Sequence, residues 1–248
     1  MASPATAPPQ LPPGLRARLE AVVGADAVIT DPERLMVYES DGLTAYRFPP
    51  GAAVFPGSTD EVSAVVRILA DEGIPFVPRG AGTGLSGGAL AVDGAVLVCT
   101  SRMNRILEVD PANRRARVQP GVINAYLTRE TRPHGLYYAP DPSSQSACTI
   151  GGNVAENSGG PHCLKYGVTS RYVIGLEVVL PDGRIVKLGG AARDDADYDL
   201  VGLFVGSEGC FGIATEIEVE LLPLPQGVRP TLGIFERLED TGRSVSRS

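Results

Sequence analysis

Two glycine-rich segments carry the residue types most suited to chemistry with a bound ligand. The first follows Arg79 and contains Gly82-Thr83-Gly84-Leu85-Ser86-Gly87, with the spacing GxGxxG. The second spans 139–163 and is dominated by Pro, Ser, Gly and Asn. Successive N–H groups of a glycine loop can enclose a phosphate, and glycines let the backbone approach a flat ligand closely. A plain surface turn for the first segment and an irregular core loop for the second remain the alternatives.

The first segment does not fit a nicotinamide-binding βαβ unit. Such a unit needs a helix directly after the loop and an acidic residue about 20 positions further on. Here Asp93-Gly94 interrupts the chain, and the apolar run 95–100 is expected to be a strand. We therefore expect a loop between two strands that meets a phosphate with its N–H groups, with Arg79 adding a positive charge.

Few side chains offer themselves for catalysis. Because His is the usual base near neutral pH, His162, beside the second glycine-rich segment, is the candidate catalytic or substrate-contacting residue. His134 is expected to be structural, and nothing in the sequence around Glu156 indicates a shifted pKa. No CxxC pair or zinc spacing exists among the cysteines and histidines, so no metal site is predicted. The cysteines, expected to be reduced thiols as in cytosol, are Cys99, Cys148, Cys163 and Cys210.

Composition excludes several classes of function. The chain has 248 residues with 22 Lys and Arg against 29 Asp and Glu, a net charge of −7, and no basic run, so nucleic-acid binding is not expected. The N-terminus does not resemble a signal peptide, and no apolar stretch approaches the roughly 18 residues of a membrane span. The sequence therefore predicts a cytoplasmic protein.

The elements that must position the first glycine loop form a β-α-β unit. Residues 1–14 are rich in Ala and Pro and are expected to be a flexible tail, followed by a helical segment over 15–47. Helices are predicted at 15–23, 32–38 and from Asp60 onward, and strands at 52–56, 75–78 and 95–100. Ser58 or Thr59 is the expected N-cap of the helix at Asp60, and Gly73 its end.

The second half of the chain favours antiparallel strands. Hairpins are predicted at 105–119 and 172–188, where polar turn residues separate alternating segments. A helix is expected over 122–131. The last strong strand, 213–221, alternates apolar residues with glutamates and so predicts one buried face and one wet face.

Three segments resemble a known family. Residues 78–84, 149–160 and 206–213 are similar, in the same order, to the three FAD-contacting segments of the FAD-binding domain of the vanillyl-alcohol oxidase/PCMH superfamily. The sequence of these segments is most similar to the glycolate oxidase D-subunit and D-lactate dehydrogenase group, and the similarity runs over 48–225. It implies an α+β fold of two lobes, a small parallel α/β lobe over about 15–100 and a larger, mainly antiparallel lobe over about 101–225, with FAD between them.

The resemblance also implies which residues contact FAD. Residues 79–84 would hold the pyrophosphate, 141–149 and 151–160 the isoalloxazine and ribityl part, and 208–213 the adenosine end. The implied cofactor-binding residues are Pro78, Arg79, Gly80, Ala81, Gly82, Thr83, Gly84, Asp141, Ser146, Thr149, Gly151, Gly152, Asn153, Asn157, Gly159, Gly160, Glu208, Gly209 and Ile213. The first loop contains no His that could attach the flavin covalently. The sequence around Cys148 resembles that of family members that bind FAD non-covalently, so dissociable FAD is expected.

The implied activity is FAD-dependent oxidation of a small 2-hydroxy acid. A hydride would pass from the substrate's carbinol carbon to flavin N5, and electrons would pass to an iron–sulfur partner or a quinone. Relatives continue into a substrate-binding domain, so 226–248 is interpreted as its truncated start, with a strand at 231–235 and a helix at 238–245. The alternative is an isolated FAD-binding module, inactive without that domain. The sequence of residues 140–160 is a poor match to a reductase that uses NADPH, as in the cell-wall branch of the superfamily.

Overall fold

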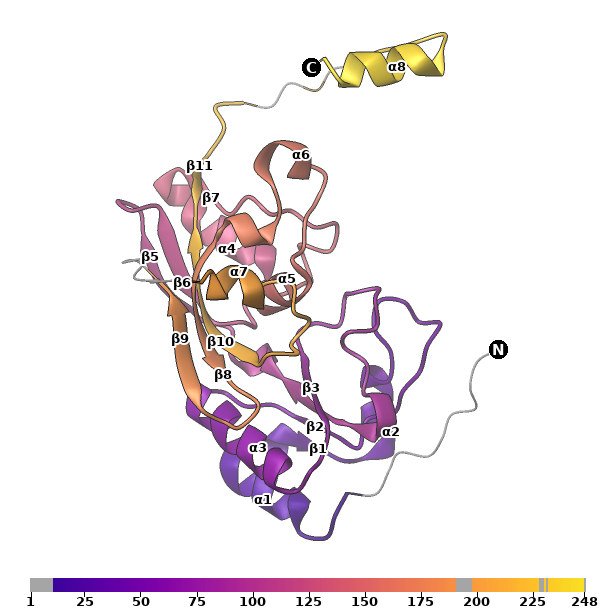
Figure 1. Ribbon diagram of the computed structural model, residues 1–248, viewed down its shortest axis with the longest axis vertical. Coiled ribbons are helices and arrows are strands. Elements are labelled where there is room, and N and C mark those ends of the chain that lie inside the picture. The colour runs from indigo at the N-terminus through magenta and orange to yellow at the C-terminus, as the bar shows by residue number, and fades with distance from the viewer. Residues whose placement is uncertain (1–10, 191–197, 228–229, 231, 248) are drawn as a thin grey trace.

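The computed structural model describes residues 11–190, 198–227, 230 and 232–247, which form two lobes and a C-terminal helix (Figure 1). The first lobe contains a four-stranded sheet of order β1-β2-β4-β3. Its strands are β1 (Val28–Ile29), β2 (Ala52–Val54), β3 (Phe76–Arg79) and β4 (Val96–Cys99). Both β2 and β3 run parallel to β4, as the sequence predicted, whereas β1, which was not predicted, pairs antiparallel with β2.

Helices cover both faces of this sheet. α1 (Leu15–Val23) and α3 (Thr59–Asp71) share one hydrophobic core with it, and α2 (Pro32–Leu35) contributes Leu35 to another. The predicted start and end of α3 are confirmed. Ser58 Oγ accepts a hydrogen bond from the Glu61 N–H at 3.2 Å, and Gly73 has a φ of 64° just beyond the helix. The predicted apolar stripe of α3 is fully buried, which holds the helix on the sheet.

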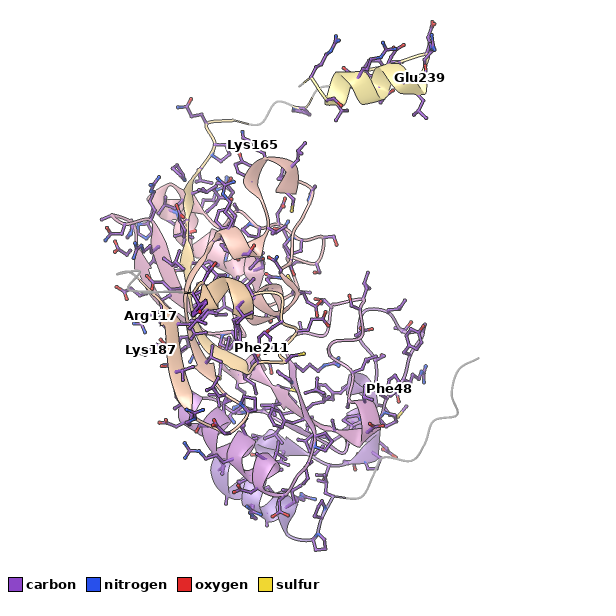
Figure 2. All side chains as sticks on the ribbon, in the orientation of Figure 1. Phe48, Arg117, Lys165, Lys187, Phe211 and Glu239 are labelled. Atoms are coloured by element: carbon purple, nitrogen blue, oxygen red, sulfur yellow. The ribbon has the colours of Figure 1, made fainter. Side chains whose placement is uncertain are left out.

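The second lobe is a five-stranded antiparallel sheet of order β5-β6-β10-β8-β9. Its strands are β5 (Ile106–Asp110), β6 (Arg115–Val118), β8 (Val173–Val179), β9 (Ile185–Gly189) and β10 (Ile213–Glu220). Both predicted hairpins are confirmed, and so is the alternation of β10, where Ile217 and Val219 are fully buried and Glu216, Glu218 and Glu220 are half-buried. On the face that carries these glutamates, Arg117 pairs with Glu216 at 2.8 Å and Lys187 lies 4.0 Å from Glu177; Figure 2 shows both cations on the side of the sheet away from α5 and α7.

The inner face of this sheet carries the helices nearest the site. They are α4 (Asn124–Thr131), α5 (Ile150–Glu156), α6 (Cys163–Tyr166) and α7 (Leu200–Phe204), and a small pair of strands, β7 (Leu136–Tyr137) and β11 (Leu222–Pro223), lies beside α4. The interpretation of 139–163 as an irregular segment is wrong at α5. Ile150 and Val154 are buried in the lobe core, and that burial outweighs the poor helix propensity of two consecutive glycines.

The lobes are joined by packing and by hydrogen bonds. Val179 and Ile213, from the second lobe, belong to the hydrophobic core of the first. Ser63 Oγ donates to the Gly183 carbonyl at 2.6 Å, and Thr59 Oγ1 donates to Glu177 Oε1 at 2.7 Å. Short 3-10 helices complete the chain at Ala25–Ala27, Met36–Tyr38, Val92–Gly94, Thr100–Arg102, Arg132–His134 and Thr169–Arg171.

The C-terminal segment lies apart from the two lobes (Figure 1). The predicted helix is confirmed as α8 (Leu238–Val245), which buries none of its residues. The predicted strand is wrong over 232–235, where the chain has no strand pairing and Leu232 and Ile234 are exposed. Residue 231 and residues 1–10 of the expected tail lie outside the described residues. In the described ranges, no helix combines the length and the apolar character needed to cross a membrane.

Candidate functional site

A cavity of about 210 Å³ lies between the loop that follows β3, the helix α5 and the turn that precedes β10. A smaller hollow of about 60 Å³ adjoins it, and the two share Gly80, Gly152 and Gly209 in their walls. Segments near residues 80, 150 and 208, distant in the sequence, therefore meet at one place. The resemblance to the FAD-binding family implied that these three segments lie together.

Most of the predicted residues line these two spaces. In the wall of the cavity are Pro78, Gly80, Ala81, Gly82, Thr83, Gly84, Thr149, Gly152, Asn153, Glu208 and Gly209. In the wall of the smaller hollow are Arg79, Gly151 and Ile213. Asp141, Ser146, Asn157, Gly159 and Gly160 line neither space. Ser144, Ala155, Glu156 and Ser158 also line the cavity and fall inside the implied flavin segments, whereas Leu85, Gly88 and Ala89 lie outside them.

The wall is built largely from backbone, because its glycines allow close approach. A Cβ at Gly80 would lie 2.6 Å from Thr149 Oγ1. The loop after β3 and the start of α5 are therefore in close contact at this point. Gly209 has a φ of 80°, and a Cβ there would lie 2.7 Å from Pro78 Cγ. Exposed main-chain groups and little side-chain bulk suit a long ligand that carries phosphates.

The Arg79 side chain is occupied within the fold. Its guanidinium donates to the carbonyl oxygens of Ser40 at 2.9 Å, Ala89 at 2.9 Å and Tyr38 at 3.3 Å, and the residue is only 6% exposed. Burial lowers the pKa of Arg79. The free positive charge that the sequence led us to expect is instead used to hold the loop closed. A backbone contact of Arg79 with a cofactor stays a prediction.

Acidic side chains border the cavity where a basic one was expected. None of the described residues that line it is Lys or Arg. A Cβ at Gly88 would lie 3.0 Å from Glu156 Oε1 and 3.1 Å from Glu208 Oε2, so both carboxylates face the same point. Glu156 lines the cavity, and partial burial, then Glu208, then Asp41, raise the pKa of its carboxyl. Local sequence around Glu156 could not predict this shift, because its acidic neighbours come from other segments.

Helix α5 begins at a well-capped position. Thr149 Oγ1 accepts a hydrogen bond from the Gly152 N–H at 3.2 Å, and a Cβ at Gly151 would lie 2.6 Å from Pro120 Cβ. The cap and the close contact fix the first turn of α5 against the second lobe. Gly152, Asn153 and Glu156 are thereby presented to the cavity.

Three further predicted residues, Asp141, Gly160 and His162, lie close together at the start of α6. His162 Nδ1 lies 2.5 Å from Asp141 Oδ2, and the His162 side chain is 66% exposed. Gly160 must lack a side chain because a Cβ there would overlap the Asp141 carbonyl. His162 lies outside the cavity wall, so its catalytic role stays a prediction. Among the described residues, no group of three or more His, Cys, Asp or Glu could hold a metal ion.

Comparison with known proteins identifies the cofactor of the chain. Residues 50–189 match the family described as the FAD binding domain. The chain belongs to this family. Its cofactor is FAD, and the backbone-lined cavity between the lobes suits a dinucleotide with a pyrophosphate. The resemblance and the α+β fold class inferred from the sequence are confirmed.

Curated relatives of this FAD-binding domain are oxidoreductases by name. The chain is 48% identical to "Glycolate oxidase subunit GlcD" of Escherichia coli K12, over 93% of this chain and 46% of the relative. It is 40% identical to "D-lactate dehydrogenase" of Anaerostipes hadrus and 37% identical to "D-2-hydroxyglutarate dehydrogenase" of Stutzerimonas stutzeri, over 84% of this chain in each case and 46% and 45% of those relatives. The chain thus spans about half the length of the curated relatives it matches.

Solved structures share the architecture. Alkyldihydroxyacetonephosphate synthase superimposes with a TM-score of 0.79 at 25% identity, covering 91% of this chain and 44% of the other. p-Cresol methylhydroxylase superimposes with a TM-score of 0.74 at 23% identity, over 86% of this chain and 44% of the other, which shows a common fold.

Proposed function

We propose that this chain is the flavin-binding part of an FAD-dependent oxidoreductase acting on small 2-hydroxy acids of the glycolate and D-lactate type. The observation that carries the proposal is 48% identity to a glycolate oxidase subunit across 93% of the chain. Relatives named for D-lactate and D-2-hydroxyglutarate support the same substrate class. All three flavin segments inferred from the sequence meet around one cavity.

Main-chain groups of the loop after β3 would hold the pyrophosphate, and the walls formed by α5 and by residues 208–209 would flank the rest of FAD. When bound, FAD supplies the redox chemistry, accepting at N5 the hydride from the substrate's carbinol carbon. The protein contributes binding and orientation. Residues 48–225 are proposed to be the FAD-binding unit of a cytoplasmic protein, with an iron–sulfur partner or a quinone as electron acceptor.

His162 is the candidate to accept the proton of the substrate hydroxyl. Asp141 engages its Nδ1, which leaves Nε2 for a substrate, and the 66% exposure of the side chain supports this role. This role belongs to the proposal and is tested by the His162→Gln variant once substrate reduction of the flavin is measured.

Dissociable FAD is part of the proposal. The loop after β3 contains no His, and the Cys148 sulfur is engaged by Asn153 Nδ2 at 3.3 Å. Acid precipitation should therefore release the yellow flavin into the supernatant. Flavin that remains in the protein pellet would contradict non-covalent binding.

The second candidate function is an FAD-binding module without turnover of its own. It is favoured by the share of the relatives that the chain spans, 46%, and by the cavity wall, where none of the described residues is a Lys or Arg that could hold a substrate carboxylate. In that case the groups that orient the substrate belong to the part of the relatives that this chain does not cover.

One experiment separates the two candidates. The purified chain is reconstituted with FAD, its visible spectrum is recorded, and glycolate, D-lactate or D-2-hydroxyglutarate is added without oxygen. A flavin spectrum that bleaches supports the oxidoreductase, and one that persists supports the binding module. Failure to bind FAD after reconstitution contradicts both.

A further inference from the structure

A line of three buried side chains connects α4 to the cavity wall. Asn124, the first residue of α4, is 1% exposed, Asn153 2% and Cys148 3%. Asn153 and Cys148 line the cavity, whereas Asn124 stands behind them. Asn124 is held in place by its backbone, because its N–H donates to the Cys148 carbonyl at 3.0 Å. None of the flavin segments recognised in the sequence includes Asn124.

The direction of the hydrogen bonds along these three side chains is determined at the Asn124 end. The carbonyl oxygen of Pro140 can only accept, so the Asn124 group that faces it at 3.0 Å is Nδ2. The same Nδ2 lies 2.8 Å from Asn153, which must therefore present Oδ1. Nδ2 of Asn153 is then left to face the sulfur of Cys148, at 3.3 Å.

The sulfur is consequently an acceptor on its protein side. The contact of the S–H with Asn153 Oδ1, at 3.9 Å, is longer than the 3.3 Å contact of the sulfur with Asn153 Nδ2, and Oδ1 already receives a hydrogen bond from Asn124. Because Cys148 lines the cavity, the thiol hydrogen can turn from that long contact toward the cavity. An S–H group is a weak donor, and a donor there faces whatever occupies the cavity.

We propose that Asn124 is a positioning residue for the cofactor-facing wall. Through Asn153 it makes the Cys148 sulfur an acceptor toward the protein and a donor toward the bound cofactor. The identity of the ligand rests on the proposed function, whereas the polarity of the three side chains is a property of the chain alone.

The variant Asn124→Asp tests the polarity because it keeps the shape and removes the donor. Asn153 then turns its Nδ2 to the new carboxylate and its Oδ1 to Cys148. The thiolate loses an N–H donor and faces an oxygen, so alkylation of Cys148 by iodoacetamide in FAD-free protein should slow about three- to tenfold at fixed pH. Loss of packing alone would loosen the wall and speed the reaction. Exposed Cys210, read by mass spectrometry in the same sample, is the internal reference.

A second variant keeps the inference testable if the first does not fold. Asn153→Asp preserves the acceptor for Asn124 and reverses only the last contact, so Cys148 should again react more slowly. An unchanged or faster rate in folded Asn124→Asp overturns the proposal, and so does the same result in Asn153→Asp should the first variant fail to fold.

Adding FAD to the wild-type chain tests the cofactor-facing half of the proposal. Bound FAD, detected by its absorption, should protect Cys148 from iodoacetamide. Alkylation of Cys148 at the same rate with FAD bound would overturn that half. Absence of FAD binding is visible in the spectrum and would count against the proposed function instead.

Discussion

At the level of single residues, we expect Glu156 to make the affinity for FAD depend on pH. Partial burial, Glu208 and Asp41 raise the pKa of its carboxyl, and on the proposed function FAD would bring two further negative charges into a cavity whose described lining has no Lys or Arg. A bound dianion disfavours the carboxylate still more, so binding takes up protons. The affinity for FAD should therefore fall as pH rises above the ordinary range of Glu, by about two- to tenfold from pH 5 to pH 8.

The variant Glu156→Gln isolates that contribution. It should bind FAD more tightly than wild type at pH 8 and show a flatter dependence on pH, measured by the quenching of flavin fluorescence. Glu130→Gln, the same change on an exposed part of α4, is the matched control. Weaker binding by Glu156→Gln at every pH would mean that the carboxylate accepts hydrogen bonds from the cofactor.

Arg79 illustrates a charge that serves the fold. Arg79→Lys keeps the charge and loses the planar fork that reaches three carbonyls, so the free energy of unfolding in urea should fall by about 1–3 kcal/mol. Because the guanidinium is engaged inside the loop, the salt dependence of FAD binding should match wild type. A variant of normal stability with a reduced salt dependence would instead place Arg79 at the phosphates.

Some properties of single residues can be predicted from the sequence, and others cannot. Glycines at 80, 82 and 209 could be assigned to the site because their spacing matches a family. The pKa shift of Glu156 could not, because its neighbours Asp41 and Glu208 lie more than 50 residues away on either side. The side-chain direction of Arg79 depends on carbonyls near residue 40, which local pattern does not reveal.

At the level of elements, two helix caps offer a comparison. Thr149 caps α5 in the cavity wall, and Ser58 caps α3 away from it. Thr149→Val and Ser58→Ala should each lower the free energy of unfolding by about 0.5–2 kcal/mol. Only Thr149→Val should also weaken FAD binding, because it frays the first turn of α5. Equal losses of FAD affinity in the two variants would contradict a specific role for the Thr149 cap.

The same two helices show why some elements are predictable. The apolar stripe of α3 recurs with helical spacing and is flanked by a cap and a glycine, so local sequence suffices. α5 is only seven residues long and contains two adjacent glycines, and it forms because Ile150 and Val154 are buried by the rest of the lobe. Its helical state depends on tertiary contacts that a local pattern does not contain.

At the level of the whole molecule, the lobes should unfold together. They share buried residues, since Val179 and Ile213 pack in the core of the first lobe, and Ser63 donates a hydrogen bond across the junction. We expect one calorimetric transition, shifted upward by FAD, with about 2.7 kcal/mol of stabilisation at 100 times Kd. Two transitions, of which FAD moves only one, would show that the lobes are thermally independent.

The strand order of the larger sheet has a consequence for biosynthesis. β10 is the last strand of that sheet along the chain, yet it lies at the centre, between β6 and β8 (Figure 1). A nascent chain leaving the ribosome therefore carries two separate hairpins until β10 emerges and joins them. The turn at 208–209, which closes the cavity, emerges just before it. Flavin capture thus belongs to the end of translation of this domain, and ribosome-bound chains stalled before residue 213 should remain without the cofactor.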